Sequence, residues 1–338
     1  MAARGRPLNV AVVGLGVGEH HAVAYARLEA CRVLWFYDLD RAKAEAVHKT
    51  LGQGGIAEDL DTLLNDERVD VVSLASFDDA HAEQVIGALR QRKHLFVEKP
   101  LCRTLDDLAA IKTCWNEAGR PKLESNLILR AAPLYKWVKD AIEGGELGDI
   151  YAFDGDYLYG RLHKITEGWR KNVTDYSVMT GGGIHLADLM LWLTGQRPSG
   201  VTAVGNRICT RSTAFGYDDF VATTYRFESG LVGRITANFG CVHSHQHVVR
   251  IFGTRGTFIS DDQGPRIHRS RDPETGPDPL DLAPIAAGKG DLIPEFIRSI
   301  VDGGETADRV QGNFDLISVC VAADKALATG NEEKIQYV

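Results

Sequence analysis

The segment Leu8–Gly18, LNVAVVGLGVG, decides the fold that this 338-residue chain is expected to adopt. A short apolar run ends at Gly14. Two further glycines, Gly16 and Gly18, follow it and precede a helical pattern. Such a loop turns tightly, exposes backbone N–H groups and places a helix N-terminus against a pyrophosphate. Glu19 stands where the third glycine of G-x-G-x-x-G would fall, so we expect Gly18 to take that role after a one-residue contraction. The segment predicts a dinucleotide-binding loop.

The sequence after this loop repeats the same alternation of strand and helix. Short apolar runs, CRVLWFYD, VDVVSLAS and KHLFVEKP, alternate with amphipathic helical patterns as far as about Lys122. Strands that are continuously apolar are typical of a parallel sheet covered by helices on both faces. Residues 1–122 are therefore predicted to form a Rossmann domain, an α/β fold with a doubly wound parallel sheet, which ends where Gly119 and Pro121 terminate a helix.

Residues 123–338 show a different pattern. Longer runs in which polar and apolar residues alternate, such as DDFVATTYRFES and LVGRITANFG, predict half-buried strands, and the ESG turn between these two predicts a hairpin. Helices are expected at about 183–193, 292–301 and 315–328, and a long surface loop at 261–291. We therefore expect a C-terminal α+β domain with a large, open, mostly antiparallel sheet.

Charge and composition exclude several classes of function. The formal net charge is −8 and the Lys and Arg residues are scattered, so nucleic acid is not an expected partner. The six cysteines have no regular spacing, which fits reduced thiols rather than disulfides. No apolar run reaches the roughly 18 residues of a membrane helix, and the N-terminal run breaks at Gly14 without a cleavage site. We expect a soluble, cytoplasmic protein with no membrane partner.

Asp38 ends the second predicted strand, CRVLWFYD. In Rossmann folds a carboxylate at this position accepts hydrogen bonds from the adenosine ribose hydroxyls and repels a 2′-phosphate. NAD is therefore expected as the cofactor in preference to NADP. Arg41 lies close enough in sequence to keep NADP as the less favoured alternative.

The fourth strand ends in Glu98-Lys99-Pro100, at the carboxyl edge of the sheet, where ligands of such folds bind. A lysine that is partly desolvated beside a nicotinamide can have its pKa lowered toward neutrality, and can then take the proton of an alcohol as hydride leaves. Pro100 restricts Lys99 to an extended conformation. The spacing alone is equally compatible with a strand exit that carries a surface ion pair.

Several motifs together resemble the glucose-fructose oxidoreductase/inositol dehydrogenase family, Gfo/Idh/MocA. They are the glycine loop, Asp38, the strand VDVVSLAS followed by His81, Glu98-Lys99-Pro100 and the downstream stretch GGGIHLADLMLWLTG. The resemblance covers nearly the whole chain, because HVVRIFGTRGTF and FIRSIVDGG also look like the family's C-terminal domain. It implies an NAD(P)-dependent dehydrogenase or reductase of sugars or cyclitols, in which residues 123–338 bind a small sugar-like substrate and form a homodimer or homotetramer through the C-terminal sheet.

The resemblance also implies roles for single residues. Lys99 is the implied acid–base catalyst. His185, in a G-x-H-x-x-D segment that ends at Asp188, is implied to bind and deprotonate the substrate. On a helix these two residues lie one turn apart and share a face, so both could point into one cleft.

One position departs from the family pattern. Many members carry an aspartate four residues before the histidine, where this chain has Gly181. Asp175, Tyr176 or a water molecule could replace that carboxylate, or proton transfer could rely on Lys99 and His185 alone.

The segment from Asp156 to Lys171 gathers cations and aromatic rings ahead of the glycine run. Cations bind anionic groups and rings pack on sugar faces, so the segment fits a polyhydroxylated, phosphorylated or carboxylated substrate as well as it fits a solvated loop. The residues expected to contact the substrate are Asp188, Arg170, Tyr157, Asn126 and Lys171. Those expected to contact the cofactor are Gly14, Gly16, Gly18, Asp38, Ser76, His81, Glu98 and Lys99.

His243, His245 and His247 alternate along a probable strand, so their side chains would share one face. No carboxylate or cysteine completes a ligand set, and hydride transfer to nicotinamide needs no metal. No metal site is expected.

The sequence therefore predicts an enzyme that transfers hydride between nicotinamide and a secondary hydroxyl or ketone of a sugar, sugar derivative or cyclitol. Two alternatives stay open. One is a redox-neutral glycoside hydrolase that uses bound NAD transiently, and the other is a non-catalytic regulator that binds cofactor and sugar.

Overall fold

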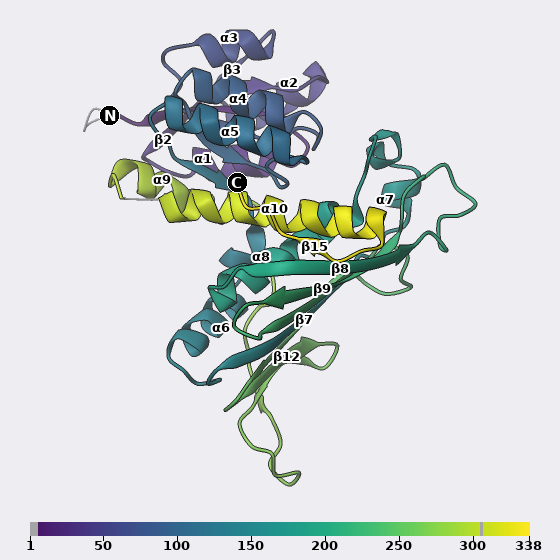
Figure 1. Cartoon of the computed structure of the whole chain (residues 1–338). Helices are drawn as coiled ribbons and strands as arrows, with labels where there is room; N and C mark the ends of the chain where they lie inside the picture. Colours follow the sequence, from purple (N-terminus) through teal and green to yellow (C-terminus); the bar gives the residue numbers. More distant parts are fainter. Residues whose placement is uncertain (1–5, 305–306) are drawn as a thin grey trace. The chain divides into compact units, whose positions relative to one another are not determined.

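The computed structural model describes residues 6–304 and 307–338, which divide into two compact units (Figure 1). The first holds the N-terminal part up to Ile128, together with Ala287–Phe314 and Val338. The second holds Leu129–Ala286 and Asp315–Tyr337. By packing, Ala287–Phe314 therefore belongs with the first unit, although the predicted division after Lys122 placed it in the second domain. The assignment of cofactor binding and substrate binding to the two domains stays a prediction.

The first unit is built on a six-stranded parallel sheet in the order β3-β2-β1-β4-β5-β6. Its strands are β1 (Leu8–Val13), β2 (Cys31–Tyr37), β3 (Gly55–Ile56), β4 (Val71–Leu74), β5 (His94–Val97) and β6 (Leu123–Ser125). The strand order reverses at the central β1 and β4, which pair directly. Val10, Ala11 and Val12 are fully buried, as expected for a strand covered on both faces. The predicted Rossmann sheet is confirmed.

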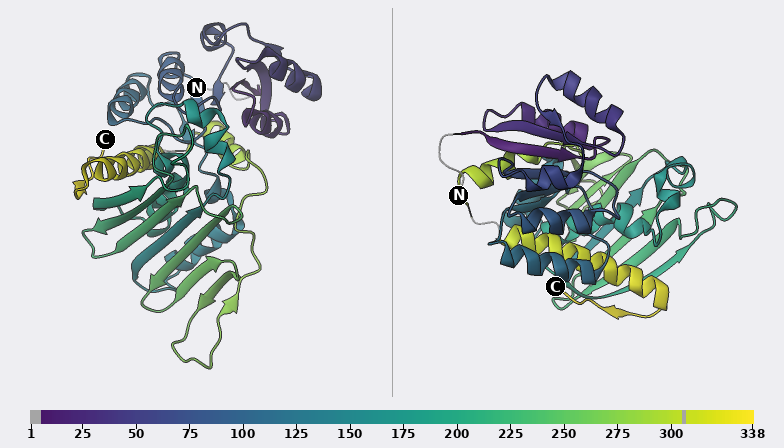
Figure 2. Two further views of the ribbon diagram at one scale, coloured as in Figure 1. Left: turned by 90° about the vertical axis from the view of Figure 1, so that its right-hand side faces the viewer. Right: turned by 90° about the horizontal axis from the view of Figure 1, so that it is seen from above.

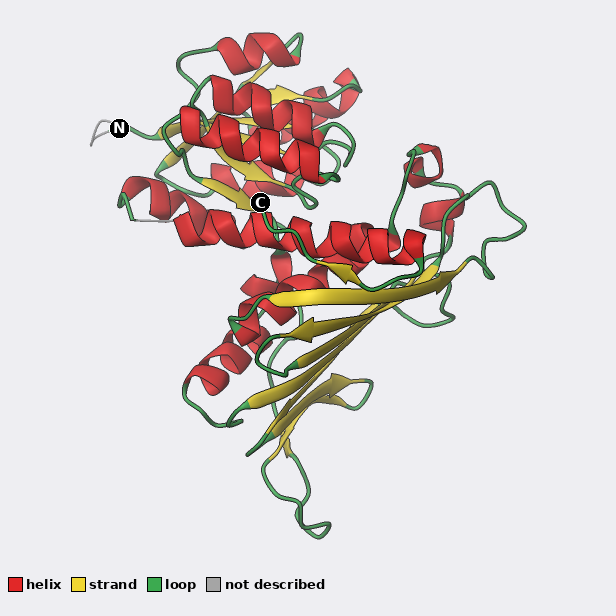
Figure 3. Ribbon diagram, in the orientation of Figure 1, coloured by secondary structure: helices red, strands yellow, loops and turns green. Residues whose placement is uncertain are grey.

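Helices flank this sheet, as the red ribbons of Figure 3 show. They are α1 (Gly18–Ala26), α2 (Arg41–Leu51), α3 (Leu60–Asn65), α4 (His81–Arg90), α5 (Leu105–Glu117), α9 (Ile293–Val301) and the first part of α10 (Ala307–Thr329). Side chains cap several N-termini: Thr104, for example, accepts a hydrogen bond from Asp107 N (3.0 Å) at the start of α5. Helix α1 packs against β1, β2 and α9, so the helix behind the glycine loop is anchored in the core.

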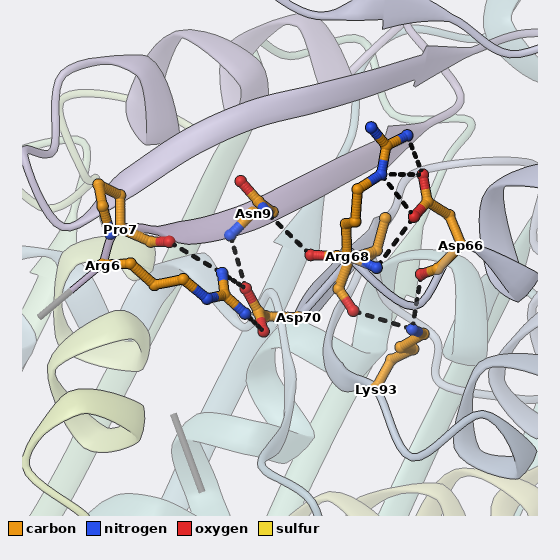
Figure 4. A network of polar contacts seen from close by, with 8 residues as sticks. Arg6, Pro7, Asn9, Asp66, Arg68, Asp70 and Lys93 are labelled. Carbon is orange, nitrogen blue, oxygen red and sulfur yellow. Dashed lines mark hydrogen bonds and ion pairs between the residues drawn. The ribbon is translucent and has the colours of Figure 1, made fainter. Parts of the chain in front are cut away.

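A polar network ties the amino-terminal ends of these strands together, at the edge of the sheet away from the glycine loop (Figure 4). Arg6 donates two hydrogen bonds of 2.8 Å to the carboxylate of Asp70. The Nζ of Lys93 donates to the carbonyl oxygens of Asp66 and Val69, both at 2.9 Å. Burial lowers the pKa of Lys93. Because ligands of such sheets bind at the opposite, carboxyl edge, we interpret this network as structural.

The second unit is built on a nine-stranded sheet in the order β14-β13-β12-β11-β7-β10-β9-β8-β15 (Figure 2). Its strands are β7 (Ile150–Leu158), β8 (Pro198–Asn206), β9 (Phe220–Phe227), β10 (Val232–Asn238), β11 (Gln246–Gly253), β12 (Thr257–Asp261), β13 (Gly264–His268), β14 (Asp278–Pro279) and β15 (Glu333–Lys334). Strands β7 and β10 pair in parallel and the other neighbours pair antiparallel. The predicted open, mostly antiparallel sheet is confirmed, and the predicted hairpin is β9–β10.

Helices cover one face of the second sheet. They are α6 (Pro133–Glu143), α7 (His163–Thr166), α8 (Ile184–Thr194) and the rest of α10, with short helical turns at Ile128–Ala131 and Trp169–Asn172 and a π-helix at Met179–Gly183. Helix α8 packs on β7 and β10 and against α6. Along β7 the buried residues Phe153 and Tyr157 alternate with less buried ones, so Tyr157 lies on the buried face of the sheet.

Two expected elements are corrected by the structure. Part of 261–291, expected as a surface loop, forms β13 and β14, and Ile267 of β13 pairs with Phe258. The strand signal was weak because each of these strands is short and contains a proline. The last helix begins at Ala307 rather than near 315. Among the helices that the structure describes, none has both the length and the apolar character needed to cross a membrane.

Candidate functional site

The three glycines between β1 and α1 occupy three different environments. Gly14 has φ +79°, and a Cβ there would lie 2.5 Å from the backbone carbonyl of Ala75. A Cβ on Gly16 would meet nothing within 4 Å, so the loop backbone is open to a ligand at this point. A Cβ on Gly18 would press against the side chains of Val12 and Ala75, at 3.2 and 3.3 Å, where α1 packs on the sheet. A tight turn, an open backbone and close helix packing are what a pyrophosphate-binding loop requires.

Asp38, directly after β2, is held against this loop. One of its carboxylate oxygens accepts a hydrogen bond from Leu15 N (2.6 Å), and the other accepts one from Asp40 N (2.8 Å). Arg41, the residue that kept NADP as an alternative, pairs with Glu45 (3.1 Å) along α2. Lys43 Nζ lies 3.8 Å from Asp38 Oδ1, but the carboxylate is the charged group in contact with the loop backbone, which suits ribose hydroxyls and opposes a 2′-phosphate.

Ser76 and His81, both expected to contact the cofactor, follow β4. Ser76 Oγ donates a hydrogen bond to Gln84 Oε1 (2.6 Å). His81 is fully buried, and its Nδ1 donates to the carbonyl oxygen of Pro100 (2.6 Å). The ring therefore supports the turn after Lys99, and a contact of His81 with the cofactor stays a prediction.

Glu98 lies in a buried polar network at the carboxyl ends of β4, β5 and β6. Its Oε1 accepts hydrogen bonds from His21 Nε2 (3.2 Å) and Asn126 Nδ2 (2.7 Å), and His21 Nδ1 lies 3.0 Å from Ser73 Oγ. Burial acts to raise the pKa of Glu98, but the interactions with His21, Asn126 and Lys99 outweigh it, so the pKa lies below its usual value. Glu98 is therefore a carboxylate at neutral pH.

Asn126, expected to contact the substrate, belongs to the same network. It is 3% exposed, and its Nδ2 also donates to the carbonyl oxygen of Lys289 (2.8 Å). The amide nitrogen is bonded to Glu98 and to backbone, and a contact of Asn126 with the substrate stays a prediction. Lys289 could not be assigned to the site from the sequence, since no local pattern links a strand end to a segment more than 150 residues later.

Lys99 is half-buried at the end of β5 and precedes a cis peptide bond to Pro100. Glu98 N donates to Leu74 O (2.7 Å), so the pairing of β5 with β4 continues up to the lysine. Four of the residues expected to bind the cofactor follow four adjacent strands: Asp38 follows β2, Gly14 follows β1, Ser76 follows β4 and Lys99 follows β5. In a parallel sheet these strand ends share one edge, so the four residues lie in this order along the carboxyl edge.

In the second unit, Tyr157 lies at the centre of a group of histidines. It is 4% exposed, and it pairs across the sheet with His247 of β11. Its ring centre lies 6.1 Å from that of His185, 5.3 Å from that of His245 and 5.2 Å from that of His247. The structure thus brings the predicted residues Tyr157 and His185 together, and it adds His245 and His247 to them.

These histidines differ in charge. Burial lowers the pKa of His245 to about 4 and that of His247 to about 3, so both rings are neutral at pH 7. His243 instead lies before β11 and pairs with Asp262 (3.2 Å), and its hydrogen bonds with Ser244 and Asp262 raise its pKa. The expected common face of the three histidines is therefore wrong. Within the described ranges, no group of three or more His, Cys, Asp or Glu side chains is placed to hold a metal ion.

Asp188 was expected to bind the substrate from the same helix as His185. It is 1% exposed, and both of its oxygens accept hydrogen bonds from Arg130, at 2.5 to 3.1 Å. Burial raises the pKa of Asp188, although the charge and hydrogen bonds of Arg130 act in the opposite direction. This pairing anchors α8, and a contact of Asp188 with the substrate stays a prediction.

The space beside Gly181, the position at which the sequence departs from the expected family pattern, is filled by a neighbouring side chain. A Cβ on Gly181 would collide with the hydroxyl group of Tyr176, which is 6% exposed. Asp175, the other residue considered for this role, is exposed, and its backbone N donates to Tyr217 Oη (2.7 Å). Of the two, Tyr176 is therefore the one that occupies the space beside Gly181.

A buried carboxylate on α10 holds the segment that leads to His185. Asp324 accepts hydrogen bonds from Ser177 Oγ (2.5 Å), two residues before the π-helix, and from Thr180 Oγ1 (3.0 Å) within it. Burial raises the pKa of Asp324 to about 6, although both hydrogen bonds act to lower it. The two remaining residues expected at the substrate site lie in the helical turn before this segment, where Arg170 is half-buried over the ring of Trp169 and Lys171 is exposed.

The profile of an oxidoreductase family with an NAD-binding Rossmann fold matches residues 8–123, and that of the GFO/IDH/MocA C-terminal domain matches residues 135–259. Inositol 2-dehydrogenase 2 of Saccharopolyspora erythraea is 26% identical over 58% of this chain, and the match spans 56% of that protein. Myo-inositol 2-dehydrogenase of Thermotoga maritima is 24% identical over 75% of each chain.

Among solved structures, levoglucosan dehydrogenase in complex with NADH and levoglucosan shares the fold. Its TM-score is 0.85 at 21% identity, and the match covers 98% of this chain and 100% of the other. The fold and the order of the two domains are therefore supported by matches over most of the chain, and not only by single motifs. The chain belongs to the Gfo/Idh/MocA family of oxidoreductases, and its N-terminal domain is the NAD-binding Rossmann domain of that family.

Proposed function

We propose that this oxidoreductase transfers hydride between NAD and a secondary hydroxyl or ketone of a sugar, sugar derivative or cyclitol. The observation that carries the proposal is the order of Asp38, Gly14, Ser76 and Lys99 along one edge of a single sheet. An elongated dinucleotide bound along this edge would have its adenosine ribose at Asp38 and its pyrophosphate at the glycine loop. Its nicotinamide end would then be directed toward Lys99.

Lys99 is the proposed acid–base residue. Bound NAD accepts or returns the hydride. As the substrate carbon loses hydride, Lys99 takes the hydroxyl proton and a ketone forms, and the reverse reaction returns both. His185 is proposed to hydrogen-bond the same hydroxyl. The neutral rings of His245 and His247 add no charge beside it, which supports a neutral polyol over an anionic substrate at this position.

The relatives support a polyhydroxylated ring as the substrate class, because they are named for inositol and levoglucosan. The position of Asp38 supports NAD over NADP. Neither the redox-neutral hydrolase nor the silent regulator is favoured by a comparable observation.

The test is a screen for reduction of NAD⁺ by the purified protein with myo-inositol, scyllo-inositol, levoglucosan and other cyclic polyols, with NADP⁺ in parallel. We expect net NADH from at least one compound and slower reduction of NADP⁺. Sugar release from a glycoside without net NADH would replace the proposal with the hydrolase. Sugar binding with no redox change over the whole panel would replace it with the regulator.

We also propose that the chain forms a cytoplasmic homodimer or homotetramer through its C-terminal sheet. The solvent face of this sheet carries the exposed residues Val204 and Val232 and the ion pair between Asp154 and Arg234 (2.8 Å). Light scattering coupled to size exclusion measures the mass of the assembly. Val232→Asp should shift that mass toward the monomer, and an unchanged mass would exclude this face.

A further inference from the structure

The network around Glu98 contains a buried histidine to which the proposed mechanism gives no role. His21 is fully buried in the first turns of α1, the helix that begins at Gly18 behind the glycine loop. Its ring lies edge-on to Phe96, at 5.2 Å between centres. Its two nitrogens face polar atoms of two strands, Ser73 of β4 and Glu98 at the end of β5.

The direction of one hydrogen bond is fixed by chemistry. Because the pKa of Glu98 lies below its usual value, its side chain is a carboxylate at neutral pH and can only accept. His21 Nε2 must therefore carry the proton and donate it. Asn126 Nδ2 donates to the same oxygen, so two donors hold this carboxylate in one orientation.

Three sets of hydrogen bonds hold the turn that carries Lys99. Glu98 N donates to Leu74 O (2.7 Å), His81 donates to the carbonyl oxygen of Pro100 (2.6 Å), and the Glu98 side chain reaches His21 and Asn126. The first two bonds join the turn to β4 and α4. Of these three, the side chain of Glu98 is the one that joins it to α1.

We propose that His21 is a positioning residue that holds the Glu98 carboxylate and so couples the helix behind the cofactor loop to the turn that presents Lys99. This inference rests on the proposed role of Lys99. Both N–H donors bond the same oxygen, Oε1, and protonation of Glu98 would remove the negative charge that strengthens both bonds. The coupling therefore weakens when Glu98 is protonated.

The charged and titratable groups around Glu98 are His21 of α1 and Lys99 of its own strand end, with neutral Asn126 beyond β6 and the backbone carbonyl of Lys289 on the remaining side. If His21 is removed, the leading interaction that opposes the effect of burial is lost, and the pKa of Glu98 should rise. The variant would then lose the carboxylate as the pH falls through a range in which the wild type keeps it.

The test compares the pH profiles of turnover of His21→Phe, Glu98→Gln, the double variant and His21→Gln, with the exposed His48→Phe of α2 as a matched control. The assay runs in the direction of ketone reduction, where Lys99 must be protonated, so that the acid-side loss of kcat reports Glu98 and not Lys99. In His21→Phe, we expect the acid-side half-maximum of kcat to move up by about one pH unit, the usual scale of such shifts. In Glu98→Gln, kcat should fall at every pH without that shift. His21→Gln, whose amide can donate to Glu98, should restore much of the wild-type profile.

The double variant distinguishes a positioning role of His21 from a role in the stability of the fold alone. Without the carboxylate, His21 has nothing to hold, so the double variant should match Glu98→Gln. If His21→Phe instead lowers kcat uniformly, or lowers it further in the Glu98→Gln background, the coupling is wrong and His21 only stabilises the fold.

NAD⁺ affinity supplies a readout besides turnover. His21→Phe should keep a folded CD spectrum and bind NAD⁺ within about threefold of the wild type, because the coupling acts on Lys99 and not on the loop itself. A wild type without turnover on any polyol of the panel would overturn the proposed function, and this inference with it. An active wild type with an unshifted His21→Phe profile would overturn this inference alone.

Discussion

At the scale of single residues, Asp38 should decide between the two nicotinamide cofactors. Its carboxylate is fixed by Leu15 N and Asp40 N beside the glycine loop, where the 2′-phosphate of NADP would meet a like charge. Asp38→Ser should therefore lower the NAD⁺ to NADP⁺ ratio of kcat/KM by more than about tenfold, since such repulsion costs several kcal/mol. Steady-state kinetics with both cofactors measures this ratio. An unchanged ratio would show that the adenosine ribose does not bind at Asp38.

A second residue-scale prediction concerns His245 and His247. Their folded-state pKa values of about 4 and about 3 lie below the ordinary value of 6.5. Between these values the unfolded chain therefore binds more protons than the folded chain. These two groups should thus lower the free energy of unfolding as the pH falls from about 6.5 toward 4. Urea unfolding at pH 7 and pH 5 measures the loss, and His247→Phe should reduce it. The side-chain NMR signals of both rings should not titrate above pH 5, whereas His243 should.

At the scale of elements, the π-helix Met179–Gly183 should not accommodate an aspartate at position 181. Gly181→Asp places its Cβ against the hydroxyl of Tyr176, so it should lower the free energy of unfolding by about 1 to 3 kcal/mol, the usual cost of overpacking. In the Tyr176→Ala background, Gly181→Asp should cost less than it does in the wild type, because the space beside position 181 is then free. Urea denaturation compares Gly181→Asp, Tyr176→Ala and the double variant with the wild type. Equal stability of Gly181→Asp and wild type would show that Tyr176 does not fill this position.

The network at the amino edge of the first sheet should contribute to stability and not to catalysis. Lys93→Met leaves the carbonyl oxygens of Asp66 and Val69 without their 2.9 Å donor, which should cost about 1 to 3 kcal/mol of unfolding free energy. Because the network lies at the edge of the sheet away from Lys99, kcat per folded molecule should stay unchanged. A specific loss of turnover in a folded Lys93→Met protein would contradict the structural interpretation.

The elements that could be predicted from the sequence are those with local signals. Continuous apolar strands and a glycine loop predicted the Rossmann sheet, and polar alternation predicted the strands of the second sheet. The π-helix was not predicted, because three consecutive glycines indicate flexibility and carry no sign of the tyrosine hydroxyl that they must accommodate. Strands β13 and β14 were missed because each is short and contains a proline.

The candidate site could be predicted only in part, because contacts between residues distant in sequence leave no local signal. Gly14, Asp38 and Lys99 were identified because each follows a strand with a recognisable motif. Asp188 and Asn126 were predicted as site residues, but their hydrogen bonds with Arg130 and Glu98 were not, because such pairing depends on residues distant in sequence. The packing of His245 and His247 around Tyr157 was not predicted for the same reason.

At the scale of the whole molecule, the chain passes between its two units more than once. It leaves the first unit after Ile128, returns at Ala287 and leaves again after Phe314. The return could not be predicted, because an amphipathic helix such as α9 shows which of its faces is buried but not which sheet buries it. The return matters for the site, since it brings the carbonyl oxygen of Lys289 to Asn126 and so completes the network around Glu98.

The measurement that tests the central claim most directly is the turnover of Lys99→Met on the best polyol of the panel, together with its affinity for NAD⁺. The account predicts that NAD⁺ binds within a few-fold of the wild-type affinity while kcat falls by roughly 10²- to 10⁴-fold, the usual cost of losing a general base. Near-normal turnover in a folded Lys99→Met protein would contradict the assignment of the proton-handling residue.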